Sequence, residues 1–255
     1  MLYYLFQLRE IFGPFNVFRY ISFRAGGAML SALALSILLG PPLIRALRRK
    51  KIGQEQRTDG PQSHLSKQGT PTMGGLLIIA AVTASTLLWM RPDVRFTWML
   101  LFVTAALGAA GFWDDYLKLV RKDPRGAPSR VKFAVQIAVA FTLVLWLAVR
   151  PPNAQFMDSL LIPYTKEACL SLGTLYFLLA LLIVVGSSNA VNLTDGLDGL
   201  ACGSIIFCAL TYGIFAYMAG NAKFAAYLRI IPVEGAGEIS VYLAALIGSC
   251  LGFLW

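Results

Sequence analysis

The stretch LSLGTLYFLLALLIVVGSS, residues 170–188, contains no charged residue and is rich in Leu, Ile and Val. About 20 mostly apolar residues are enough for a helix to cross the hydrocarbon core of a bilayer. Further uncharged stretches of similar length occur at residues 25–44, 73–90, 96–113, 133–149, 200–219 and 239–255. We therefore predict seven membrane-spanning segments.

The composition supports a membrane protein. Hydrophobic residues make up 57% of the chain and charged residues 14%, and the mean hydropathy is +0.66. Lipid admits only helices or closed barrels, and these stretches lack the alternation of barrel strands. The predicted fold class is an all-α, polytopic transmembrane helical bundle that forms a single domain over residues 1–255. The cysteines show no metal-like or disulfide-like spacing, so we assign them no chemistry; they are Cys169, Cys202, Cys208 and Cys250.

The distribution of positive charge predicts the orientation. If the N-terminus lies outside, the inner loops are 45–72, 114–132 and 187–199, and the first two hold seven and six Lys and Arg residues. No outer segment holds more than three, as the positive-inside rule requires. Most of the net charge of +9 is then explained by the orientation of the chain in the membrane, so it does not indicate a nucleic-acid partner.

Asp114 and Asp115 stand side by side directly after the third apolar stretch. Two adjacent carboxylates repel each other, and the dipole near a helix C-terminus also disfavours them. The simpler interpretation is a solvated helix end with Lys118, Arg121 and Lys122 nearby. The functional interpretation places a divalent cation or a proton between the two carboxylates.

The inner segment SSNAVNLTDGLDG, residues 187–199, carries four polar side chains and no positive charge. Asn189 and Asn192 are three residues apart, as are Asp195 and Asp198, and Gly196 lies between the aspartates. Each pair shares one face if the segment is helical. Turn formation and capping of the next helix explain one or two such residues. Four of them indicate an oxygen-rich pocket.

A third inner segment, SKQGTPTMGG at residues 66–75, leads into the second apolar stretch. It has the features of an ordinary helix start. A helix N-terminus with nearby glycines also offers backbone N–H groups to an anion, and Lys67 adds positive charge. Because all three inner segments lie at one membrane surface and offer oxygen ligands, together they favour Mg²⁺ and phosphate.

Three motifs resemble those of the phospho-N-acetylmuramoyl-pentapeptide-transferase family: SKQGTPTMGG, GFWDDYLKLVRKD at residues 111–123, and NAVNLTDGLDGLA at residues 189–201. The resemblance spans nearly the whole chain. It implies an Mg²⁺-dependent enzyme of the bacterial inner membrane, with a periplasmic N-terminus and a cytoplasmic active site. Its substrates would be UDP-MurNAc-pentapeptide and undecaprenyl phosphate, and its products lipid I and UMP in peptidoglycan synthesis. A second copy of the chain is a further candidate partner, besides the lipid bilayer.

The resemblance also implies roles for single residues. Asp114 and Asp115 would be catalytic and candidate metal ligands, one taking a proton from the lipid phosphate and the other holding substrate or metal, in an order left open. The substrate-binding residues would be Lys67, Thr72, Asn189, Asn192, Asp195, Gly196, Leu197 and Asp198. Among these, Asp198 would contact the uracil edge, because a carboxylate accepts from the ring N–H.

One departure from the family concerns the end of the chain. The family continues after the seventh span with a cytoplasmic loop that carries the principal metal-binding aspartate, a later histidine loop, and about ten spans in all. This sequence ends at Trp255. Loss of that aspartate would remove much of the charge compensation for phosphoryl transfer. We therefore expect the 255-residue chain alone to be inactive or nearly so.

Three alternatives stay open. A related enzyme could transfer N-acetylglucosamine phosphate from UDP-GlcNAc to the same lipid. A transporter could use an unwound stretch at residues 186–192, although the absence of charge within the apolar stretches argues against it. The chain could also be an inactive fragment of the transferase.

Overall fold

The structure is a computed structural model that describes residues 1–49, 74–121, 126–162, 169–195 and 199–255. The apolar stretches form the main helices. They are α1 (Ile21–Arg49), α2 (Gly75–Trp89), α3 (Arg95–Arg121), α4 (Ser129–Val149), α5 (Thr174–Thr194), α6 (Leu200–Ala219) and α8 (Gly237–Leu254). The predicted all-α bundle is confirmed, since each predicted span overlaps one of these helices.

The remaining elements are short. Two 3₁₀ helices, η1 (Leu2–Glu10) and η2 (Gly13–Arg19), precede α1. A third, η4 (Ala154–Phe156), follows α4 and leads into an antiparallel pair of strands, β1 (Ser159–Leu161) and β2 (Cys169–Ser171). Helix α7 (Ala222–Leu228) follows α6. None of these elements is long enough to cross a bilayer.

One of the seven helices is shorter than predicted. Six helices of the described chain are long and apolar enough to span a membrane, whereas α2 is a shorter apolar helix of 15 residues. At 1.5 Å per residue it is about 22 Å long, which is less than the roughly 30 Å of a hydrocarbon core. It ends where the backbone becomes extended at Met90.

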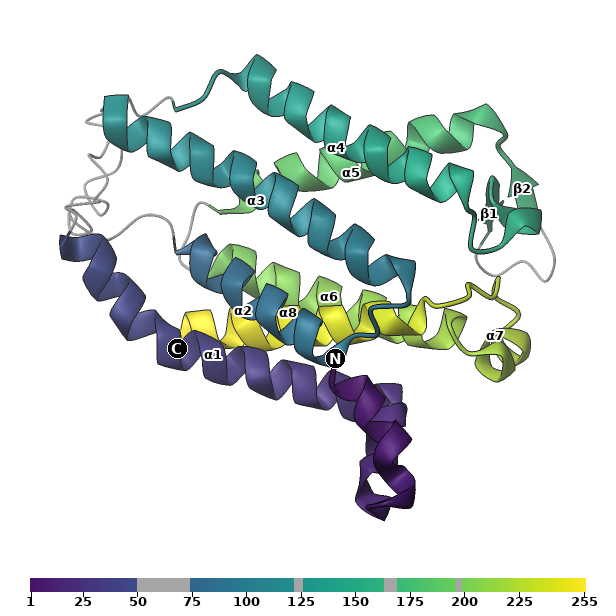
Figure 1. Cartoon of the computed structure of the whole chain (residues 1–255). Coiled ribbons are helices and arrows are strands. Elements are labelled where there is room, and N and C mark those ends of the chain that lie inside the picture. The colour runs from purple at the N-terminus through teal and green to yellow at the C-terminus, as the bar shows by residue number, and fades with distance from the viewer. Residues whose placement is uncertain (50–73, 122–125, 163–168, 196–198) are drawn as a thin grey trace.

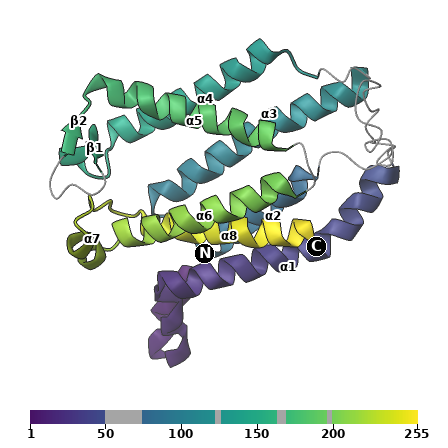
Figure 2. The ribbon, with the colours of Figure 1, turned by 180° about the vertical axis from the view of Figure 1, so that it is seen from behind.

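The helices run alternately up and down the bundle. The C-terminal ends of α1, α3, α5 and α8 and the N-terminal ends of α2, α4 and α6 gather at one end, on the left in Figure 1 and on the right in Figure 2. We call this the site end. The strand pair, α7 and the start of α1 lie at the other end, which we call the outer end, and η1 and η2 project from it away from the bundle.

Helix α8 is the most buried of the spans, since half of its 18 residues are buried inside the protein. Small residues let it approach α1 closely: a Cβ atom on Gly248 would collide with the Met29 carbonyl, and one on Gly252 would lie 3.0 Å from the Leu33 carbonyl. Close backbone approach of this kind is a main source of helix association in membranes. A buried cluster of Ala28, Ala32, Met90, Val241 and Ala245 completes the contact.

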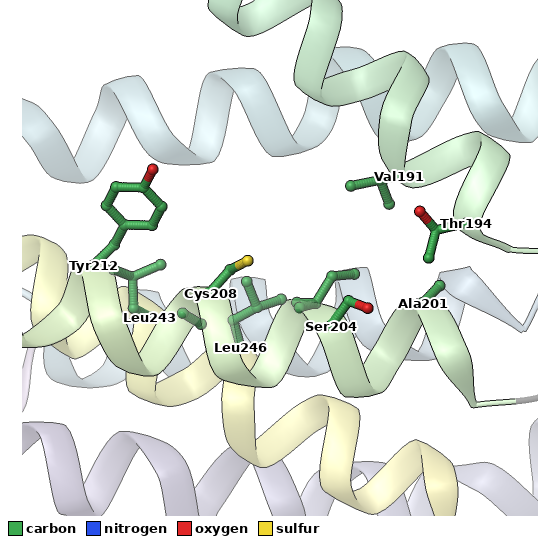
Figure 3. A pocket seen from close by; sticks show the side chains of 10 residues that line it. Val191, Thr194, Ala201, Ser204, Cys208, Tyr212, Leu243 and Leu246 are labelled. Atoms are coloured by element: carbon green, nitrogen blue, oxygen red, sulfur yellow. The ribbon is translucent and has the colours of Figure 1, made fainter.

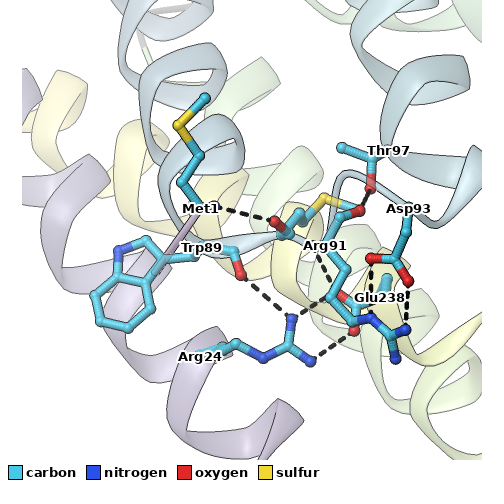
Figure 4. Close-up of polar contacts among 8 residues, drawn as sticks. Met1, Arg24, Trp89, Arg91, Asp93, Thr97 and Glu238 are labelled. Atoms are coloured by element: carbon cyan, nitrogen blue, oxygen red, sulfur yellow. Dashed lines mark hydrogen bonds and ion pairs between the residues drawn. The ribbon is translucent and has the colours of Figure 1, made fainter. Parts of the chain in front are cut away.

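A buried ion pair joins α1 to α8 at the outer end (Figure 4). The Arg24 guanidinium donates to both carboxylate oxygens of Glu238 at 2.6 Å, and the two side chains are 1% and 4% exposed. Arg24 also donates to the Trp89 carbonyl, and the Arg91 backbone N–H donates to Glu238. Since buried charges need partners of this kind, the cluster holds the starts of two spans and the end of α2 together.

Candidate active site

Asp114 is the most firmly held carboxylate at the site end. Its Oδ1 lies 2.7 Å from Lys132 Nζ and accepts a hydrogen bond from the Ala127 backbone N–H at 2.7 Å. Its Oδ2 lies 2.8 Å from Lys118 Nζ. The Asp114 side chain is 13% exposed, so each oxygen is already compensated by a nearby donor in a partly buried setting.

Local helical geometry explains this arrangement. Because α3 continues to Arg121, Lys118 lies one turn after Asp114 on the same face. Residues 126–128 lead into α4, which begins at Ser129. Lys132, in the first turn of α4, faces back to α3. The prediction that Asp114 lies near a helix end therefore needs adjustment: it stands about two turns before that end, where the helix dipole has little effect.

Asp115 has a different environment. It is 35% exposed, and among the residues that the structure describes only Lys118 contacts its carboxylate, at 3.2 Å from Oδ1. The two adjacent aspartates therefore differ in how much of their hydrogen-bonding capacity is already used. Within the described residues, Asp115 therefore keeps more free acceptor capacity than Asp114.

Helix α4 connects the aspartates to the Asn-containing segment. Gln136 lies one turn after Lys132, so both side chains are on the same face of α4. Gln136 donates to Ser188 Oγ at 3.2 Å and accepts from Asn189 Nδ2 at 2.7 Å. The same Asn189 nitrogen also donates to the Val185 carbonyl at 2.8 Å. One face of α4 thus contacts Asp114 on α3 through Lys132 and Asn189 on α5 through Gln136.

The other predicted site residues fall into two groups. Asn192 lies in the last turns of α5 and Asp195 directly follows that helix, and both are exposed. Within the described ranges, no side-chain contact joins either of them to Asp114 or Asp115. Five predicted residues lie outside the described residues: Lys67, Thr72, Gly196, Leu197 and Asp198.

All three predicted inner loops are partly helical, since α1 continues through residues 45–49 of the first. Helix α3 continues through the first residues of the loop 114–132, and α5 continues through Thr194 into the loop 187–199. A polar side chain does not stop a helix, because the backbone hydrogen bonds continue where the apolar run ends. Asn189 and Asn192 are therefore carried by a helix, as their spacing allowed.

Sequence reasoning missed Lys132 and Gln136. Lys132 counted only as a topological charge, and Gln136 lay inside the apolar stretch 133–149. Their spacing of four residues is a usable signal, since it places an amide and an ammonium group on one face of a helix start. Without knowledge of which helix packs against α4, that signal does not identify their partners.

A metal ion would find a small donor set here. The described residues contain no group of three or more His, Cys, Asp and Glu side chains that could hold a metal. Mg²⁺ commonly uses one or two protein carboxylates together with waters and substrate phosphates. Asp115, with Asp114 beside it, fits that mode of binding.

An apolar groove starts beside the end of α5 and runs along α6 (Figure 3). It has a volume of about 190 Å³. Val191 and Thr194 of α5 line one end of it, and Leu243 and Leu246 of α8 lie on its floor with the side chains of α6. The α6 residues are Ala201, Ser204, Ile205, Cys208, Ala209 and Tyr212. The groove therefore extends from the site end along α6, where Cys208 and Tyr212 are exposed.

The fold and the site define a multi-pass helical membrane protein with a charged site at one end of its bundle. A family model described as glycosyl transferase family 4 matches residues 97–255. Signature 1 of phospho-N-acetylmuramoyl-pentapeptide-transferase matches residues 67–79.

Curated relatives extend the match to the whole chain. The phospho-N-acetylmuramoyl-pentapeptide-transferase of Endomicrobium trichonymphae is 51% identical over 100% of this chain and 71% of the relative. The proteins of the same name from Syntrophus aciditrophicus and Ruegeria pomeroyi are 49% and 48% identical over 100% of this chain, which covers 70% and 71% of them. The chain belongs to the phospho-N-acetylmuramoyl-pentapeptide-transferase family.

Proposed function

We propose that the protein transfers phospho-MurNAc-pentapeptide from UDP-MurNAc-pentapeptide to undecaprenyl phosphate, giving lipid I and UMP for peptidoglycan synthesis. The observation that carries this proposal is the ion-paired Asp114 next to the more open Asp115 at the site end. It stands in a chain whose relatives bear this enzyme's name.

We place the site end at the cytoplasmic face of the bacterial inner membrane and the N-terminus in the periplasm. The helices of the site end lead into the two connectors richest in Lys and Arg, residues 45–72 and 114–132. The positive-inside rule assigns such connectors to the cytoplasm. The nucleotide substrate is a cytoplasmic metabolite by its chemistry, since a charged UDP-sugar does not cross lipid.

The reaction is an in-line attack by a phosphate oxygen of the lipid on the β-phosphorus of the UDP-sugar. A new P–O bond forms at that phosphorus, the bond from it to the bridging oxygen breaks, and UMP leaves with the electron pair. The protein's contribution is therefore alignment and charge compensation. Lys118 and Lys132 balance the charges of Asp114 and Asp115, so the four side chains together add no net repulsion to the incoming phosphates.

We propose Mg²⁺ as the cofactor, held by Asp115 with help from Asp114. Both Asp114 oxygens already face ammonium or amide donors, which leaves Asp115 as the better ligand. When bound, the ion offsets charge on the diphosphate and on the departing UMP. Chelation by EDTA should abolish turnover and added Mg²⁺ should restore it; full turnover in EDTA would contradict the assignment.

The proposed substrate contacts come from connectors whose flanking helices end at the site end. Lys67 and Thr72 would contact phosphate, and Asn192, Asp195 and Asp198 the nucleoside, with Asp198 at the uracil edge. Gly196 and Leu197 would complete that segment. Asn189 would act through its remaining carbonyl oxygen, because its amide nitrogen is already used by Gln136 and Val185.

The groove along α6 would take part of the isoprenoid chain. It is lined almost entirely by apolar side chains and adjoins Thr194, directly before Asp195. A lipid whose hydrocarbon lies in this groove would have its phosphate near the site end. The groove thus offers a route by which a membrane-dissolved acceptor meets a water-soluble donor.

The decisive experiment is a transfer assay on detergent-solubilised protein expressed from its natural gene. Radiolabelled UDP-MurNAc-pentapeptide and undecaprenyl phosphate should give label that extracts with lipid, together with stoichiometric UMP. Labelled UDP-GlcNAc is the matched donor control and should give none. Transfer from UDP-GlcNAc alone would establish the related transferase, and flux of substrate across liposomes without conversion would establish a transporter.

One further expectation belongs to this proposal. A homodimer is expected in the membrane, and light scattering in detergent measures its mass.

A further inference from the structure

The short turn at residues 126–128, which leads into α4, lies directly against the Asp114 carboxylate. Gly126 has a φ of +65°, in the left-handed region that L-residues rarely adopt. The next residue, Ala127, is 3% exposed, and its backbone N–H donates to Asp114 Oδ1 at 2.7 Å. The conformation of Gly126 thus directs a backbone donor inward to one aspartate.

Space as well as conformation favours glycine at this position. A Cβ atom on residue 126 would collide with Asp114 Oδ1 and would lie 2.8 Å from Lys118 Cε and 3.0 Å from Lys118 Cγ. Both neighbours are part of the ion-paired site. A side chain at residue 126 would therefore push on the carboxylate and its lysine at the same time.

A turn that served only to connect two helices would not need this contact. Its backbone N–H groups could be satisfied by water or by the last carbonyls of α3. Here the donor is used on a carboxylate that also contacts Lys132 of the next helix. The turn and Lys132 bind the same oxygen, so together they fix the position of Asp114 relative to both helices.

We propose that Gly126 is a positioning residue for the transfer reaction, which acts by holding the Asp114 carboxylate through the Ala127 N–H. The proposal rests on the function proposed above. Lys118, which pairs with Asp114 Oδ2, also lies 3.2 Å from Asp115 Oδ1, so the held Asp114 restrains Asp115 through this shared lysine. The turn thereby sets where the open carboxylate meets the substrate phosphates.

The test compares Gly126→Ala with Gly126→Asn and Gly173→Ala. Asn tolerates the left-handed conformation far better than Ala but still adds a Cβ against Asp114. Gly173 has a φ of +53° with nothing within 4 Å of an added Cβ, so its Ala variant carries the backbone strain without crowding the site. Each protein, expressed from the natural gene, is checked for a single gel-filtration peak before transfer kinetics are measured.

Both Gly126 variants should fold and lose kcat on the order of 10²-fold, as a misplaced catalytic group does. Their KM for UDP-MurNAc-pentapeptide should stay within about twofold of wild type, and Gly173→Ala should keep its kcat. Normal kcat in Gly126→Ala, which suits neither the conformation nor the space, would overturn the proposal. Normal kcat in Gly126→Asn alone would support it, because the left-handed conformation that directs the Ala127 N–H would then carry the effect. Failure of both Gly126 variants to fold would also overturn it. If the wild-type protein itself makes no lipid I, the proposed function fails instead.

Discussion

Removing one partner of the buried ion pair at the outer end should destabilise the protein strongly. In Glu238→Gln the Arg24 guanidinium stays 1% exposed but loses both charged contacts, each 2.6 Å long. Its remaining acceptors are neutral: the single amide oxygen of the glutamine side chain and the Trp89 carbonyl, 3.2 Å away. Leaving a buried charge without its counter-ion costs about 3–5 kcal/mol. We expect the free energy of unfolding to fall by that amount.

Equilibrium unfolding in mixed micelles with increasing SDS, followed by far-UV circular dichroism, measures this change. The double variant Arg24→Met, Glu238→Met should be more stable than Glu238→Gln, because it leaves no unpaired charge. Asp93→Asn is the matched control, since Asp93 and Arg91 pair at the same end with side chains 45% and 34% exposed. Exposed pairs contribute about 0–1 kcal/mol. A Glu238→Gln protein within about 1 kcal/mol of wild type would refute the reasoning.

Three further predictions concern the site. Asp115→Asn should abolish lipid I formation while the gel-filtration profile stays that of wild type; normal turnover would remove Asp115 from the catalytic machinery. Lys132→Met should lower kcat by roughly 10²-fold through a misplaced Asp114, measured in the same transfer assay, and an unchanged kcat would mean that the ion pair is dispensable. Ser204→Trp should fill the groove along α6 and raise the KM for undecaprenyl phosphate without changing the KM for the nucleotide. A wild-type KM for undecaprenyl phosphate in this variant would place the lipid elsewhere.

The sequence was a good guide to the helices because an apolar stretch is local information. Each predicted span contains the residues that a helix buries in lipid or against its neighbours, whichever helix packs beside it. The ends were less predictable. Helix α3 continues to Arg121 and α5 to Thr194, since a helix needs its backbone hydrogen bonds and not an apolar surface to continue. The short α2 reflects the early extended backbone at Met90.

The candidate site was predictable in its residue types and not in its pairings. Adjacent aspartates without an evident structural use drew attention to Asp114 and Asp115. Asp114 differs from Asp115 because Lys132 and the Ala127 N–H contact its carboxylate. Both donors follow α3 in the chain and come close to Asp114 only in the folded protein. No pattern within α3 separates the two aspartates, because the difference is tertiary.

Helix α4 gives the site its rigidity. Lys132 and Gln136 lie one turn apart on one face, and they contact Asp114 of α3 and Asn189 of α5 respectively. A rotation of α4 about its axis would therefore disturb both contacts together. Groups that are carried by packed helices hold their geometry better than groups on free loops. For a reaction whose catalysis is mainly alignment, this coupling is the property that the bundle supplies.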